Sequence, residues 1–167
     1  MKKIELTDEI KSTARDYAKR ITKAIGDPKD SNYTGLNRTD QYYIGYLGEL
    51  AFKTLLEAEG KMFTYDPKFN GVADTGDFTL MTVLDRGVTV DVKTAGEDFH
   101  KKLMLPKVQY AKANYLIYIG AKLDGDICEI HGWCYGSELT EEFVKIPTMS
   151  IPFSELKDID DLLVKIQ

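Results

Sequence analysis

The stretch from Val88 to Thr94, VTVDVKT, decides the fold that we expect for this chain. Three valines alternate with Thr89, Asp91 and Lys93. Successive side chains of a β-strand point to opposite faces, so the stretch predicts a strand with one wholly apolar face. The other face carries an aspartate and a lysine. A strand with one face in solvent has the same pattern, so two interpretations are open: a solvated surface and a functional site.

A second aspartate is expected to lie beside this strand. The sequence Leu84–Gly87, LDRG, predicts a turn that joins the strand to a preceding one. Antiparallel pairing across that turn places Asp77 opposite Val92, to within one position, and therefore at the same end of the hairpin as Asp91. Two carboxylates in this arrangement can share a cation. Asp74 is a nearby competitor, and either aspartate has the alternative of capping the backbone of its own turn.

A glutamate is expected to approach from a helix. Apolar residues at helical spacing predict a helix from about residue 39 or 40 to residue 60, buried on much of its surface. Glu49 lies on the same side of this helix as Phe52. Gly45 and Gly48 remove side-chain bulk and would allow a close approach to the sheet. A buried carboxylate is costly unless it is paired or bound to metal, and the alternative is an ion pair with Lys53 at i+4.

Three carboxylates and a lysine therefore converge in this interpretation: Glu49, Asp77, Asp91 and Lys93. Oxygen ligands of this kind suit Mg²⁺ or Mn²⁺ rather than zinc. The sequence has no Cys/His spacing of a zinc site, no Gly-rich phosphate loop and no G-x-S-x-G nucleophile elbow.

In this order, the segments GYLGELA (45–51), GDF (76–78) and VDVKT (90–94) resemble the PD-(D/E)XK nuclease superfamily. The resemblance covers roughly residues 40–120, with Gly76 where the family name has proline. It implies an α/β fold, at the border of α+β, with a restriction-endonuclease-like architecture: a central mixed β-sheet flanked by helices.

The resemblance also implies the chemistry of the site. Asp77 and Asp91 would bind Mg²⁺ or Mn²⁺, together with Glu49 and the backbone carbonyl of Val92. Lys93 would orient or activate the water that attacks a phosphodiester. Because carboxylates beside a lysine favour its charged form, its role is electrostatic and positional.

We therefore expect a Mg²⁺-dependent endonuclease that acts on DNA rather than RNA. Two alternatives are open: a catalytically silent member of the same fold that binds nucleic acid or protein, and an unrelated α/β domain whose Asp-x-Lys strand is solvated. A homodimer would suit an enzyme that cuts both strands of a duplex. The candidate nucleic-acid contacts are Arg38, His100, Lys101, Lys102, Lys107 and Gln109. A solvated charged loop explains residues 100–107 equally well.

Composition predicts one globular domain over residues 1–167, in the cytoplasm. No apolar run approaches the ~20 residues of a membrane span, and no secretory signal follows Met1. Cys128 and Cys134 lie on one predicted strand, about 20 Å apart, which is beyond disulfide reach. The net charge of −5 is unevenly distributed: +2 over residues 1–30, −1 over 31–120 and −6 over 121–167. A locally basic face is therefore compatible with the acidic total.

Further elements follow from periodicity and capping signals. We expect a helix over Asp8–Ile25 with Thr7 as its N-cap, a short helix within 106–113, and a closing helix over 154–166 with Ser154 as its N-cap. Strands are predicted at 61–65, 77–83, 88–94, 115–122 and 127–135.

Overall fold

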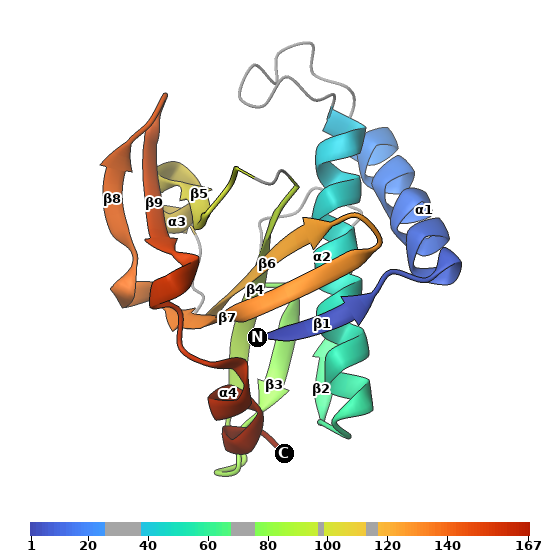
Figure 1. Ribbon diagram of the computed structural model, residues 1–167, viewed down its shortest axis with the longest axis vertical. Coiled ribbons are helices and arrows are strands. Elements are labelled where there is room, and N and C mark those ends of the chain that lie inside the picture. Colours follow the sequence, from blue (N-terminus) through green and yellow to red (C-terminus); the bar gives the residue numbers. More distant parts are fainter. Residues whose placement is uncertain (26–37, 68–75, 97–98, 113–116) are drawn as a thin grey trace.

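The computed structural model describes residues 1–25, 38–67, 76–96, 99–112 and 117–167 (Figure 1). The chain begins with strand β1 (Lys2–Glu5), followed by helix α1 (Asp8–Ile25) and helix α2 (Arg38–Ala58). The bounds predicted for α1 are confirmed. The amide of Ile10 donates to Thr7 Oγ1 over 3.3 Å, so Thr7 is its N-cap as expected. Asp74 lies outside the described residues.

The predicted central mixed sheet is confirmed. Six strands lie in the order β1-β7-β6-β4-β3-β2. The strands after α2 are β2 (Phe63–Tyr65), β3 (Phe78–Met81), β4 (Gly87–Ala95), β6 (Ile117–Asp124) and β7 (Ile127–Tyr135). β4 and β6 run parallel, and every other neighbouring pair in this sheet is antiparallel. Helices and a mixed sheet in one chain give an α/β fold at the border of α+β, as predicted.

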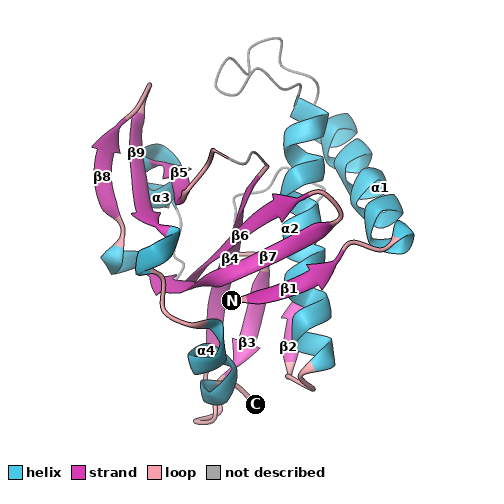
Figure 2. Cartoon of the chain, in the orientation of Figure 1, coloured by secondary structure: helices cyan, strands magenta, loops and turns pink. Residues whose placement is uncertain are grey.

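A second sheet was not predicted. Strands β5 (Lys102–Pro106), β8 (Thr140–Phe143) and β9 (Pro147–Pro152) form it in the order β5-β9-β8. The charged loop expected over residues 100–107 is therefore wrong for β5, in which Leu103 and Leu105 are buried. Helix α3 (Lys107–Lys112) follows β5 directly, and this short helix was predicted. Figure 2 shows the small sheet and α3 at the end of the molecule away from α1.

The end of the chain also differs from expectation. Two short elements replace the single predicted helix: a 3₁₀ turn, Phe153–Glu155, and helix α4 (Ile159–Lys165). The N-cap of α4 is Asp158, whose carboxylate accepts the amide of Asp160 over 3.0 Å, so the assignment of Ser154 as N-cap is wrong.

Two apolar clusters lie on opposite faces of β6 and β7. The main core packs α1, α2 and α4 with the large sheet, and it includes Val90, Val92 and Ile119. The second cluster contains Leu103, Leu105, Tyr118, Cys134, Leu139, Met149 and Ile151. Since side chains alternate along β6, Tyr118 points away from the main core and towards the small sheet. β6 and β7 are therefore covered on both faces.

Within the described residues, no helix is both long and apolar enough to cross a membrane. Cys128 and Cys134 are buried free thiols, as their spacing on one strand predicted.

Candidate active site

The hairpin of β3 and β4 places the two aspartates at one end. Phe78 pairs with Val90, so continuing the register by one residue sets Asp77 across from Asp91. The amide of Asp77 donates to the carbonyl of Val90 over 2.9 Å, and the amide of Val92 donates to Asp77 Oδ2 over 2.8 Å. The position of Asp77 is thus within the predicted tolerance of one residue. Its carboxylate accepts a backbone N–H of the neighbouring strand, which ties Asp77 to β4.

Asp91 and Lys93 do not lie on a solvated face. The side chain of Asp91 is only 2% exposed, and Lys93 Nζ lies 2.8 Å from Asp91 Oδ2, with the lysine side chain 18% exposed. Tyr118 pairs with Asp91 in the register of β4 and β6 and packs in the second cluster. The Asp91 side of β4 therefore faces the small sheet, which covers it. The interpretation of this strand as one with a solvated face is wrong.

Glu49 comes from the helix side of β4. It is half-buried on α2, and Tyr65 donates its hydroxyl to Glu49 Oε2 over 3.0 Å. Lys53 pairs instead with Glu57, so the alternative ion pair between Glu49 and Lys53 is wrong.

Tyr65 is a site residue that the sequence analysis missed. Its ring stacks on Phe78 with a centroid distance of 4.8 Å and an interplanar angle of 25°. Tyr65 and Phe78 are also paired in the register of β2 and β3. No sequence motif marks this tyrosine, because its contact with Glu49 exists only once β2 lies beside α2.

Gly48 brings α2 against β4. A Cβ atom built at Gly48 would lie 1.9 Å from Thr94 Oγ1, which is far inside van der Waals contact. The predicted role of Gly48 in a close approach is therefore confirmed. The same role expected for Gly45 is wrong, because a Cβ atom there would have no neighbour within 4 Å among the described residues.

Negative charge is crowded at Asp77. Burial raises the pKa of the Asp77 carboxyl well above its usual range, and the charges of Glu49 and Asp91 raise it further. The Lys93 ammonium and the hydrogen bond from the Val92 amide oppose this shift without cancelling it. Burial and Glu49 also raise the pKa of the Tyr65 phenol. The two carboxylates that raise the pKa of Asp77 thus come from different sides of β4, Glu49 from the helix side and Asp91 from the other.

The donor chemistry of these residues fits a hard divalent cation, although the site is not a closed cage. Among the described residues, no three Asp, Glu, His or Cys side chains are gathered closely enough to hold a metal ion as they stand. The charges of Glu49 and Asp91 nevertheless both raise the pKa of Asp77. All are oxygen donors, which Mg²⁺ and Mn²⁺ prefer, and a cation would relieve their mutual repulsion.

The candidate nucleic-acid contacts fall into two separate groups. Arg38 is the first residue of α2. The others lie around the small sheet, where Lys102 Nζ is 2.6 Å from Glu142 Oε2 and Lys107 Nζ is 2.6 Å from Glu141 Oε2. These two lysines are largely neutralised. The members of this second group are His100, Lys101, Lys102, Lys107 and Gln109.

Comparison of the chain with protein-family models, with curated proteins and with solved structures found no match.

Proposed function

We propose that this chain is a divalent-metal-dependent endonuclease of the PD-(D/E)XK type that hydrolyses phosphodiester bonds in DNA. The crowding of negative charge at Asp77 carries the proposal. A half-buried carboxylate whose pKa is raised by burial and by the charges of two other carboxylates is costly to the fold and is typical of a functional site. The order along the chain also supports the proposal: the superfamily has a glutamate on a helix, then an aspartate in a hairpin, then an Asp-x-Lys strand, and Glu49, Asp77 and Asp91–Lys93 follow this order here.

Each side chain has a distinct role in this proposal. Asp77, Asp91 and Glu49 would hold Mg²⁺ or Mn²⁺, with the backbone carbonyl of Val92 as a further ligand. Tyr65 orients Glu49 through its hydroxyl. When bound, the cation favours ionisation of a water and offsets the charge that develops on the phosphate.

Lys93 acts on the substrate side of the site. Its ammonium is fixed beside the buried carboxylate of Asp91, 2.8 Å from Oδ2. A cation held in place can accept a phosphate oxygen as a partner and help to orient the attacking water without moving when charge develops. The role is electrostatic and positional.

A second candidate function is a catalytically silent module of the same fold that binds nucleic acid or protein. The observation that favours it is the lack of a ready-made cluster of three metal-binding side chains in the described part of the chain. Turnover separates the two functions, because a silent module binds DNA but does not cut it.

Cleavage assays test the proposal directly. Linear duplex, single-stranded, circular and branched DNA, with RNA as a comparison, are incubated with Mg²⁺ or Mn²⁺. We expect cleavage by the wild type, and a loss of about 10²–10³ in rate for Lys93→Ala, by comparison with the loss of one preorganised donor. Lys145→Ala, at an exposed turn between β8 and β9, is the control and should cleave at the wild-type rate.

Folding has to be checked separately, because Lys93→Ala leaves the Asp91 carboxylate buried without its cation. Asp77→Asn is the second variant, since its amide oxygen can still accept the Val92 N–H. Stable but inactive Asp77→Asn protein supports the proposal. Wild-type cleavage rates in folded Lys93→Ala or Asp77→Asn protein would exclude the assigned mechanism.

We further propose that the protein acts in the cytoplasm, as its two free thiols suggest, and that a homodimer forms if both strands of a duplex are cut.

A further inference from the structure

The outer surface of α1 is basic beyond its first turn. Arg15, Lys19 and Lys23 are exposed and follow one another at i+4 spacing, so they lie along one side of the helix. Asp16 is paired with Arg20, with Arg20 Nε 2.8 Å from Asp16 Oδ2. Three cations with no acidic partner among the described residues thus extend over about 12 Å, at 1.5 Å per residue.

Arg38 extends this surface onto α2. The hydroxyls of Thr22 and Thr39 are 3.1 Å apart and hydrogen-bonded, which holds the end of α1 beside the start of α2. Lys23 follows Thr22, and Arg38 precedes Thr39. We define the basic surface as Arg15, Lys19 and Lys23 of α1 together with Arg38, which the contact between Thr22 and Thr39 brings near the end of α1.

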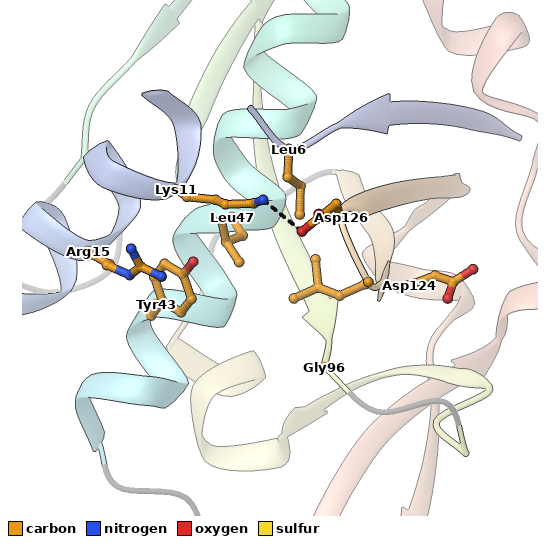
Figure 3. Close-up of a pocket in the computed structure, with 10 residues that line it drawn as sticks. Leu6, Lys11, Arg15, Tyr43, Leu47, Gly96, Asp124 and Asp126 are labelled. Carbon is orange, nitrogen blue, oxygen red and sulfur yellow. Dashed lines mark ion pairs between the residues drawn. The ribbon is translucent and has the colours of Figure 1, made fainter. Parts of the chain in front are cut away.

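A pocket lies at the Arg15 end of the basic surface. Its volume is about 490 Å³, and α1, α2 and the turn between β6 and β7 form its walls (Figure 3). The Arg15 guanidinium lies over the Tyr43 ring, 5.4 Å from its centroid. Lys11 is paired with Asp126, 2.7 Å apart, and Asp124 also lines the far wall. The negative charges of Asp124 and Asp126 would repel an anion from this wall, so an anion in the pocket would lie beside the helices.

The pocket also reaches the strand that carries the candidate active site. Gly96 lines it, directly after the end of β4 and three residues beyond Lys93. That separation is about 10 Å along an extended strand. An anionic chain on the basic surface would thus continue towards the end of β4.

We propose that the basic surface binds the phosphate backbone of DNA; this rests on the proposed function and names a second contact of the same substrate. Along about 12 Å of axis, one strand of duplex DNA carries about three to four phosphates, which is comparable with the number of cations. A membrane fits less well. Among the described side chains of α1, none is a large exposed hydrophobic residue that could enter a bilayer.

Salt-dependent binding tests this assignment without cleavage. Fluorescence anisotropy of a labelled 20-base-pair duplex is measured in EDTA over a range of NaCl concentrations. The test variant, Lys19→Gln with Lys23→Gln, keeps helix propensity and removes two charges. The control, Arg86→Gln with Lys145→Gln, removes two exposed charges from the β3–β4 and β8–β9 turns.

We expect the slope of log Kobs against log salt to fall by about 2 in the test variant, since each phosphate contact contributes about 0.9. Affinity at low salt should fall about tenfold or more, whereas the control stays near the wild type. An unchanged slope, or an equal loss in the control, would overturn the inference. The inference would also be overturned if the wild type bound phosphatidylserine vesicles more tightly than DNA and the test variant lost that binding.

The outcome is separable from that of the proposed function. If the salt slope falls in the test variant but the protein never cleaves DNA, the basic surface is supported and the proposed nuclease activity is excluded. If the protein cleaves DNA in a metal-dependent way but the salt slope of the test variant is unchanged, the nuclease activity is supported and the basic surface is excluded as a DNA contact.

Discussion

At the scale of single residues, the candidate active site is defined by where charge is placed rather than by exposure. Asp91 is buried and has a lysine 2.8 Å away, whereas the pKa of Asp77 is raised by burial and by the charges of Glu49 and Asp91. Burial of like charges is unfavourable unless a proton or a cation compensates for it. The free energy of folding should therefore depend on pH through Asp77.

The folded protein should lose stability as the Asp77 carboxyl ionises. Because the folded-state pKa of Asp77 is raised, its stabilising contribution is complete below about pH 4 and is lost as pH rises through the raised value. We expect Asp77→Asn to match the wild type near pH 4 and to exceed it at pH 8 by about 0.5–2 kcal/mol in free energy of unfolding. Urea unfolding at both pH values measures this difference.

Asp77→Ala is the matched control for the hydrogen bond. It also removes the charge but leaves the Val92 amide without its acceptor, which costs about 1–3 kcal/mol. We expect it to be less stable than Asp77→Asn at every pH. An Asp77→Asn protein that is less stable than the wild type at pH 8 would rule out charge crowding as the dominant effect.

At the scale of elements, local signals predicted structure well and long-range pairing was missed. The bounds of α1 follow from Thr7 and from apolar periodicity, both of which act within one turn. β5 pairs with β9, whose residues lie about 45 positions later, and neither strand has a strong alternating pattern. Missing this sheet made the Asp91 side of β4 look solvated. The contact of Glu49 with Tyr65 was also missed, because it depends on the long-range proximity of β2 and α2.

The packing of α2 on β4 gives an element-scale prediction with an internal control. Gly48→Ala would place a methyl group 1.9 Å from Thr94 Oγ1, and such overpacking costs about 1–3 kcal/mol. Gly45→Ala, on the same helix, meets no atom within 4 Å among the described residues and should stabilise the helix by about 0.5–1 kcal/mol. Thermal unfolding of the two variants measures the difference. Equal Tm changes would contradict the close approach.

At the scale of the whole molecule, the acidic total hides an uneven distribution of charge. The net charge is −5, yet Arg15, Lys19 and Lys23 follow one another along α1, and Lys23 and Arg38 are each next to a residue of the contact between α1 and α2. The sequence analysis placed Arg38 among the nucleic-acid contacts and found that residues 1–30 are basic. It could not join the two observations, because the proximity of α1 and α2 is a tertiary feature.

Cation binding at the candidate active site should stabilise the whole fold. A ligand that binds only the folded state adds RT ln(1 + [L]/Kd), about 2.7 kcal/mol at 100 times Kd, or roughly 5–10 °C in Tm for a chain of this size. We expect Mg²⁺ or Mn²⁺ to raise the Tm of the wild type at pH 8, where Asp77 is least protonated. The increase should shrink at pH 5, because protons compete with the cation for a carboxyl whose pKa is raised.

Two controls isolate the site in that experiment. NaCl at equal ionic strength accounts for general screening, and Asp77→Asn removes one ligand while keeping the hydrogen bond to Val92. The increase in Tm should be largely absent in the variant. An equal increase in Asp77→Asn and wild type would place the bound cation elsewhere and remove Asp77 from the metal site, whatever the cleavage assays show.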